Sequence, residues 1–318
     1  MKSERCARVV LSTLLICAML VPRIVLASPF AYVPNEKSGT ISIIDTATDT
    51  VVTEVRIGTK PRGLAISGNT LFVSDQPANA LVLMDLESRS VSGTVPLGES
   101  PEGVSASPGG DWVVAASEIS NSVSFIDTAT KRREFSIVTE GKNPEHAVFS
   151  PDGRLLLVSA EEADSVDLID VAQRKQVASI KVGMRPRGIA FRPDGLVAYV
   201  ACEIASTVYA IDVPGRKVLK EIKAGNFSNG VAMAPDGRQV YISNGRDGTV
   251  SVIDTESNTV TATIPVGKRP WNMAMTPDGK KLYVANGRSN SVSVIDTASK
   301  AVSKEISVGE LPWGVVIK

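Results

Sequence analysis

The chain has 318 residues with 34 basic and 34 acidic side chains, so it carries no formal net charge. Its single histidine cannot supply the ligand cluster that a copper or haem site requires. The sequence contains no block of Lys and Arg, so we expect no nucleic-acid partner.

Residues 1–27 are typical of a secretory signal peptide. A basic start precedes an apolar run of 13 residues, residues 9–21, which is short for a membrane span. Small residues then suit cleavage after Ala27. An uncleaved anchor is the alternative, but a proline and an arginine interrupt the apolar run. We therefore expect a mature protein of residues 28–318 that is periplasmic or secreted.

The cysteine pattern follows from this cleavage. Cys6 and Cys17 would leave with the signal peptide, and Cys202 would remain as the single thiol of the mature chain. We expect no internal disulfide, although an exported protein could form one. Cys202 lies at the end of a predicted strand, so we interpret it as a small buried apolar residue rather than a catalytic thiol.

An apolar strand that ends in Asp and a polar turn returns seven times. The spacing is 40 to 43 residues, which is the period of a four-stranded propeller blade. The seven residues are Asp45, Asp85, Asp127, Asp170, Asp212, Asp254 and Asp296. We interpret each as a turn former whose carboxylate accepts the backbone N–H two residues on, and we predict no metal site.

Four sections make up one repeat, most clearly in residues 269–309. The first is apolar on successive residues, as in residues 273–275, and predicts an innermost strand that is buried on both faces. A Pro-Asp-Gly turn and a second strand follow. In the third section Ser291 and Ser293 alternate with valines, as expected of a strand nearer the rim.

The two ends of the mature chain complete each other. The chain begins with FAYVPN, a second section without a first, and ends with residues 312–317, a first section with nothing after it. The C-terminal strand should therefore join the N-terminal blade and close the ring. We predict an all-β fold, a seven-bladed β-propeller of four-stranded antiparallel blades, which forms a single domain over residues 28–318. We expect it to be a monomer.

The residue after the proline of each repeat should project near the mouth of the central tunnel, where propeller function usually resides. The residue type at this position differs from blade to blade, whereas the repeat residues around it recur. It holds Arg62, Glu102, Glu145, Arg187, Asn229, Trp271 and Trp313. Together with His146, which follows this position in the fourth blade, these residues form our predicted binding site for a ligand or partner.

Two interpretations of this mouth remain open. A neighbouring loop adds Glu118, Glu161 and Glu203, so one sector is acidic and the opposite sector, with Trp271 and Trp313, is aromatic. If the mouth is a ligand site, these two tryptophans should lie near each other and exposed. The mouth could be a pocket for a cation or an amphipathic organic ligand. Alternatively, it could be a solvated rim whose acids aid solubility, with the tryptophans plugging the tunnel.

A catalytic group is conceivable only at the histidine. His146 stands beside Glu145 and near Arg187 of the next blade, and such a group could perform acid–base work near neutral pH. A tolerated substitution at the tunnel wall is the alternative. The chain has no GxSxG nucleophile elbow, so we assign no catalytic residue and no cofactor.

The pattern YVAN…VSVIDT…VGxxPxG resembles the YVTN-family β-propeller repeat over the whole mature chain. Three phrases look most like exported seven-repeat proteins associated with PQQ-dependent alcohol catabolism: NEKSGTISIIDTAT after residue 34, SPGGDWVVAASEISNSVSFIDTAT from Ser107, and the terminal LPWGVV. This resemblance implies a periplasmic protein that accompanies a transport system and quinoprotein dehydrogenases. The chain lacks the Trp-docking repeats that hold PQQ in those enzymes, so we expect no PQQ binding.

The function most consistent with these features is an exported, non-catalytic binding or scaffold protein. Its partner would be a small molecule or a periplasmic protein, such as a quinoprotein dehydrogenase or transport component of alcohol catabolism. One alternative is a lactone hydrolase, because some seven-bladed propellers open lactones with His, Glu and Arg at the tunnel mouth. A cell-surface adhesion propeller is the other alternative.

Overall fold

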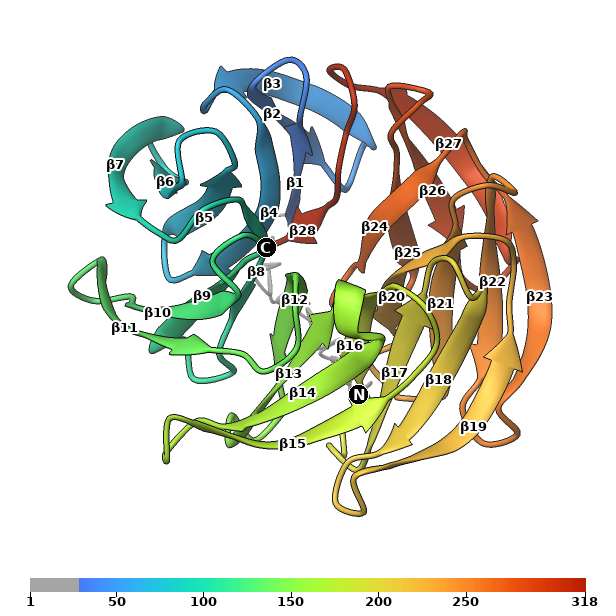
Figure 1. Cartoon of the computed structure of the whole chain (residues 1–318). Helices are drawn as coiled ribbons and strands as arrows, with labels where there is room; N and C mark the ends of the chain where they lie inside the picture. Colours follow the sequence, from blue (N-terminus) through green and yellow to red (C-terminus); the bar gives the residue numbers. More distant parts are fainter. Residues whose placement is uncertain (1–28) are drawn as a thin grey trace, which may run out of the picture.

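The computed structural model describes residues 29–318. Seven four-stranded antiparallel sheets stand as blades around a central tunnel (Figure 1). The predicted fold class is therefore confirmed. Among the described residues, no helix is long and apolar enough to cross a membrane.

Each blade places its strands in order from the tunnel outward. Blade 1 consists of β28 (Val316–Ile317), β1 (Phe30–Asn35), β2 (Thr40–Asp45) and β3 (Thr50–Arg56). Blade 2 consists of β4 (Pro61–Ser67), β5 (Thr70–Asp75), β6 (Ala80–Asp85) and β7 (Ser90–Pro96). Blade 3 consists of β8 (Pro101–Ala106), β9 (Trp112–Ser117), β10 (Ser122–Asp127) and β11 (Arg132–Val138). Blade 4 consists of β12 (Pro144–Phe149), β13 (Leu155–Ala160), the short 3-10 helix η1 (Glu161–Ala163), β14 (Ser165–Asp170) and β15 (Lys175–Lys181).

The last three blades repeat the same order. Blade 5 consists of β16 (Pro186–Phe191), β17 (Val197–Cys202), β18 (Thr207–Asp212) and β19 (Lys217–Lys223). Blade 6 consists of β20 (Ser228–Met233), β21 (Gln239–Asn244), β22 (Thr249–Asp254) and β23 (Thr259–Pro265). Blade 7 consists of β24 (Pro270–Met275), β25 (Lys281–Asn286), β26 (Ser291–Asp296) and β27 (Ala301–Ser307).

The C-terminal strand closes the ring as predicted. In Figure 1 the red β28 lies beside the blue β1, and Ile317 pairs with Ala31 in an antiparallel register. The Trp313 N–H also donates to the Pro34 carbonyl oxygen at 3.0 Å. These bonds occupy the inner edge of blade 1, which would otherwise be an unpaired strand edge.

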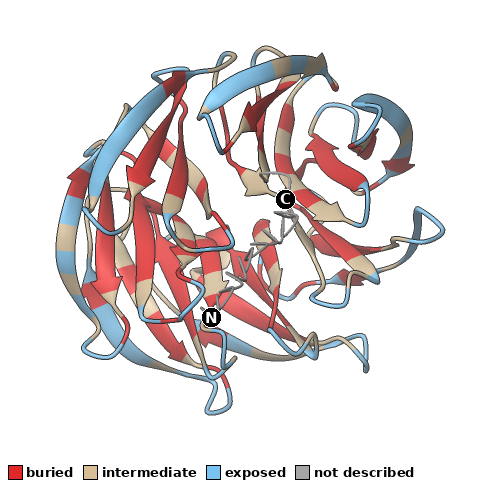
Figure 2. Ribbon diagram, turned by 180° about the vertical axis from the view of Figure 1, so that it is seen from behind, coloured by how far each residue is buried: buried red, intermediate tan, exposed pale blue. Residues whose placement is uncertain are grey.

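The hydrophobic core lies between neighbouring blades, where the sheets pack face to face. Buried residues fill the inner and middle strands, and exposed residues line the outermost strands (Figure 2). One cluster joins Ile41 and Ile43 of blade 1 to Leu71 and Val73 of blade 2. Because each blade buries both faces against its neighbours, no blade is stable without the ring.

One detail of the predicted blade is wrong. All six residues of β5 are buried, whereas the innermost β4 alternates between buried and partly exposed residues, because one of its faces lines the tunnel. The third strand lies nearer the rim, as predicted, but its polar side chains are not exposed, since Ser293 is fully buried. The Asn286 Nδ2 donates to the Ser293 hydroxyl at 2.8 Å, so the polar alternation belongs to a buried network.

The recurrent Asp residues act in turns, with a small change from the prediction. The Ser299 N–H donates to Asp296 Oδ1 at 2.7 Å, which is three residues on rather than two. The predicted donor two residues on is present as well, most directly in the first blade, where the Ala47 N–H donates to Asp45 at 2.7 Å. The fourth residue after each recurrent Asp adopts a left-handed conformation, as Lys300 does with a φ of 54°.

Cys202 is a free, fully buried cysteine at the end of β17. Burial raises the pKa of its thiol to about 12, so the side chain stays protonated and behaves as a small apolar group. The predicted signal peptide, with Cys6 and Cys17, lies outside the described residues.

Deleting residues 311–318 should destabilise the protein by several kcal/mol. The deletion removes β28 together with the side chains of Trp313 and Val315, each only 8% exposed, and large apolar side chains contribute roughly 1.5–3 kcal/mol each when buried. Thermal and chemical unfolding of the truncated and full-length proteins measures the loss. A melting temperature within about two degrees of the parent would show that ring closure contributes little.

Candidate functional site

The geometry of the tunnel mouth comes from how closely the innermost strands approach each other. A Cβ atom added at Gly63 would meet the Glu102 carbonyl oxygen and would lie 2.7 Å from the Val104 nitrogen of the next blade. The strand register also shifts between Pro61 and Leu64, as it does at the same place in every innermost strand from blade 2 to blade 7. Such a bulge re-aims the side chains within it.

The first ionic group at the mouth centres on Arg62. Its Nε pairs with Glu36 Oε2 at 3.1 Å, and its Nη1 pairs with Glu102 Oε1. The Gln76 amide also donates to Glu102. The Glu102 side chain is fully buried and that of Arg62 is 20% exposed, so the charges of three blades are joined in a site largely shielded from water.

The second ionic group centres on Arg187. Its guanidinium lies 2.5 Å from Glu145 Oε1, 2.6 Å from Glu161 Oε1 and 3.2 Å from Glu203 Oε2. Burial alone would lower the pKa of Arg187, but these carboxylates outweigh it and raise that pKa. Arg269 of blade 7 extends the group by pairing with Glu203 at 2.5 Å. Four residues that directly follow the proline of their repeats therefore pair with each other, Arg62 with Glu102 and Arg187 with Glu145.

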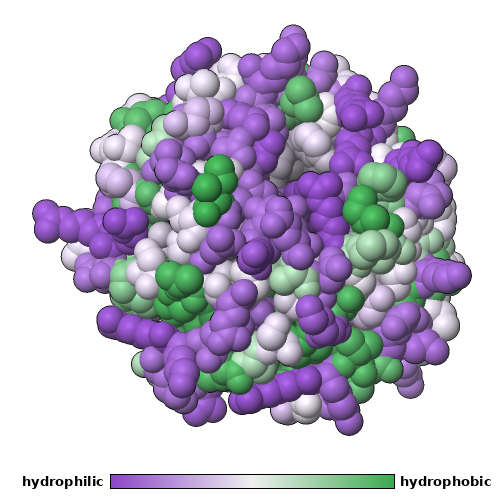
Figure 3. All heavy atoms as spheres, in the orientation of Figure 1, coloured by the Kyte–Doolittle hydropathy of each residue, from purple (hydrophilic) through white to green (hydrophobic). Residues whose placement is uncertain are grey.

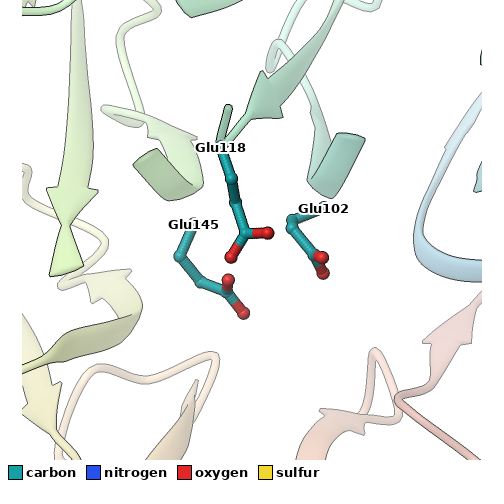
Figure 4. Close-up of side chains that lie close together, drawn as sticks. All are labelled: Glu102, Glu118 and Glu145. Atoms are coloured by element: carbon teal, nitrogen blue, oxygen red, sulfur yellow. The ribbon is translucent and has the colours of Figure 1, made fainter. Parts of the chain in front are cut away.

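Three carboxylates meet between these two groups. Oxygen atoms of Glu102, Glu118 and Glu145 lie within 4.8 Å of one another, and Figure 4 shows the three side chains converging. Burial and the charge of Glu145 raise the pKa of Glu102 well above its ordinary value, and burial also raises the pKa of Glu118. Burial alone would raise the pKa of Glu145 too, but the charges of Arg187, His146 and Arg62 together outweigh it and lower that pKa. These opposed shifts are the electrostatic result of crowding like charges.

Trp313 is buried, whereas the interpretation of the mouth as a ligand site requires this ring to be exposed. Its ring stacks on His146 with centroids 5.5 Å apart and an interplanar angle of 13°, and it is 8% exposed. Trp313 enters from blade 1 and His146 from blade 4, three blades away around the ring, so the stacked pair spans the tunnel. Trp313 therefore fits the interpretation of a tunnel plug.

A small cavity adjoins this plug. Its volume is about 130 Å³. It is lined by Leu64, Val104, His146, Asn272, Trp313, Gly314 and Val315. The His146 Nδ1 is 3.9 Å from Glu145 Oε1, so the predicted His–Glu–Arg group does come together, although beneath a tryptophan ring.

Trp271 has a different environment from Trp313. A Cβ atom added at Gly287 would lie 2.9 Å from its ring, so Trp271 packs directly on the backbone of its own blade. The Arg269 guanidinium carbon lies 6.0 Å from the Trp271 ring centroid, within cation–π range. The remaining slot residue, Asn229, is 4% exposed.

A cavity that the sequence analysis missed opens between the loops of blades 6 and 7. Its volume is about 650 Å³. Its lining includes Phe227, Arg246, Lys268, Arg269 and Arg288. The matching sequence signal is an Arg after the loop glycine in both blades and a Lys-Arg pair before Pro270.

In Figure 3, hydrophilic side chains surround the hollow at the centre of the molecule.

Seven blades, a closing C-terminal strand and a charged tunnel mouth define a seven-bladed β-propeller. The model of the YNCE-like β-propeller family matches residues 8–318, so the chain belongs to that family. The finer resemblance to proteins of PQQ-dependent catabolism stays a prediction. A search of curated proteins finds no match.

Several solved structures share the fold. Hydrazine synthase of Kuenenia stuttgartiensis is 24% identical with a TM-score of 0.78, over 84% of this chain and 92% of that chain. A protein of unknown function from Desulfotomaculum acetoxidans is 20% identical with a TM-score of 0.80, over 91% of this chain and 98% of that chain. A candidate 6-phosphogluconolactonase from Bacteroides uniformis is 20% identical with a TM-score of 0.75, over 92% of this chain and 100% of that chain. At these identities the likeness establishes the fold alone.

Replacing Trp313 with Ala should lower the free energy of unfolding by about 3–5 kcal/mol, the usual cost of truncating a large buried aromatic residue. Trp271→Ala is the matched control, because its ring is partly exposed and should contribute less. Denaturant unfolding of both variants provides the comparison. Equal losses in the two variants would contradict the assignment of Trp313 as the plug.

Proposed function

We propose that the protein is an exported, non-catalytic binding propeller whose ligand is an anion, a small molecule bearing a carboxylate or a phosphate. The observation that carries this proposal is the basic cavity between blades 6 and 7. Four cationic side chains line it: Arg246, Lys268, Arg269 and Arg288. Within residues 29–318, only Arg269 of these four pairs with a carboxylate.

The cavity has the size and chemistry of a ligand site. Its volume of about 650 Å³ lies inside the usual range of roughly 300–1,000 Å³ for small-molecule sites. Guanidinium groups bind carboxylates and phosphates through paired hydrogen bonds. The Phe227 ring adds an apolar face, and Arg246 and Arg269 lie over it at 5.8 and 5.5 Å.

The one acidic side chain in the lining, Asp247, offsets only part of this charge. Asp247 accepts the Asn226 backbone N–H at 2.7 Å and the Asn226 side-chain amide at 2.8 Å. Its carboxylate is therefore engaged by neutral donors at the cavity wall. With four basic side chains against this one acid, the lining keeps a net positive charge for an incoming anion.

A lactone hydrolase is the second candidate function, and the contact of His146, Glu145 and Arg187 favours it. The cavity beside His146 argues against it, because about 130 Å³ is well below the usual lower limit of roughly 300 Å³ for a ligand site. An assay of lactone hydrolysis tests this candidate. Turnover that is lost in His146→Ala would replace the binding proposal with an enzymatic one.

The biological setting we propose is accessory to PQQ-dependent alcohol catabolism and its transport system. The support is the likeness of three sequence phrases to exported proteins of that setting. Full oxidation of an alcohol gives a carboxylate, which is the class of anion that suits the basic cavity. The third candidate, an adhesion propeller, requires exposure on the cell surface, and cell fractionation distinguishes it from a periplasmic protein.

The double variant R246Q/R288Q should weaken anion binding by at least tenfold, because each charge-assisted hydrogen bond is worth about 1.5–3 kcal/mol. Isothermal titration with inorganic phosphate, succinate and 6-phosphogluconate provides the measurement. The matched control is R132Q/R133Q, which removes two exposed arginines of β11 in blade 3, away from the cavity. Binding that is absent from the parent protein, or equally weakened in both double variants, would overturn the proposal.

A further inference from the structure

We propose that Glu102, Glu118 and Glu145 form a binding site for one divalent cation with the coordination chemistry of Ca²⁺. The site lies at the tunnel mouth, between the ionic groups of Arg62 and Arg187. It is separate from the basic cavity of blades 6 and 7 and does not depend on the anion proposed there. The sequence analysis predicted no metal here.

The geometry of the three carboxylates suits one ion. Their candidate ligand atoms all lie within 4.8 Å of one another. Two oxygens on a single Ca²⁺, each bound at about 2.3–2.6 Å, can be at most about 5 Å apart. Hard oxygen ligands and no nitrogen or sulfur in the cluster favour Ca²⁺ over a transition metal.

A second observation points to a ligand at this place. Among the described residues, Glu102 Oε2 and Glu145 Oε2 are buried and have no hydrogen-bond partner. The two side chains are 0% and 1% exposed. A buried carboxylate oxygen without a partner is costly, and the free energy is recovered when a cation binds it.

The other oxygen of each buried carboxylate is already held. Glu102 Oε1 pairs with Arg62, and Glu145 Oε1 pairs with Arg187 at 2.5 Å. Each glutamate is therefore fixed by an arginine through one oxygen, which leaves the second oxygen to the cluster in which the three side chains converge (Figure 4). Such fixed ligands lower the entropic cost of binding an ion.

Glu118 completes the cluster from a different element. It follows β9, and the Ser100 hydroxyl donates to its Oε2 at 2.9 Å, which orients the carboxylate. Glu118 is only partly buried, so it leaves a route from the mouth and room for water to fill the remaining coordination positions. The cluster shares its two guanidiniums with Glu36, Glu161 and Glu203, so they do not fully compensate three ionised carboxylates, and the remaining negative charge favours a cation.

The test measures Ca²⁺ binding to the chelator-treated mature protein by isothermal titration and by thermal unfolding. We expect one Ca²⁺ per chain, a melting temperature that rises with Ca²⁺, and weaker binding of Mg²⁺. Glu118→Gln should weaken Ca²⁺ binding about 10- to 100-fold, since it removes one charged ligand. Glu36→Gln is the matched control, because Glu36 pairs with Arg62 at the same mouth but lies outside the cluster. It should bind Ca²⁺ as the parent protein does.

Three results would overturn the proposal. The first is the absence of Ca²⁺ binding by the parent protein at millimolar concentration. The second is unchanged Ca²⁺ affinity in both Glu118→Gln and Glu118→Asp. The third is a melting temperature that responds to pH but not to Ca²⁺, since this would assign the cluster to carboxylates that share a proton. The parent titration alone decides the first point, whatever the folding of the variants.

Discussion

The close approach of the innermost strands around the tunnel is the constraint on which the mouth depends. At Gly63, Gly103, Gly188 and Gly230 an added side chain would meet the backbone of the next blade; at Gly103 the Cβ would lie 2.6 Å from the Glu145 carbonyl oxygen. The residue before each of these glycines is therefore held beside its counterpart in the neighbouring blade. Seven variable side chains are packed together as a result, and most of them lose contact with water.

Packing charged residues so closely requires that they neutralise each other. Glu102 and Glu145 are fully or almost fully buried, and Arg62 and Arg187 pair with them. The positive charges around Glu145 lower its pKa, whereas Arg62 does not offset the burial and like charge that raise the pKa of Glu102. A buried ion pair seldom stabilises a fold more than apolar packing would, so its presence suggests a role in binding or specificity. Glu102 and Glu145 occupy consecutive blades, and two like charges at this one junction produce the acidic cluster.

The repeat made most of the fold predictable. A fixed period, the Pro-Asp-Gly turns and the complementary chain ends led to seven blades and to the pairing of β28 with β1. The burial of individual strands was harder to predict, because an apolar run does not distinguish β4, which lines the tunnel, from β5, which lies between blades. The stacking of Trp313 on His146 could not be predicted either. His146 is three blades away, and no local pattern shows which side chains meet across a tunnel. The basic cavity was missed because its residues flank the variable slot instead of occupying it.

Substituting one glycine of the tunnel wall tests most directly whether the mouth depends on the close approach of the innermost strands. Gly63 and Gly93 both belong to blade 2, but a Cβ at Gly93 would meet only a Leu83 methyl group at 3.9 Å. If close strand approach shapes the mouth, Gly63→Ala should lower the free energy of unfolding by about 1–3 kcal/mol, as overpacking does. Gly93→Ala should then change it by no more than about 0.5 kcal/mol in either direction. Equal stability of the two variants in denaturant unfolding would show that the innermost strands can separate freely, and would contradict this constraint.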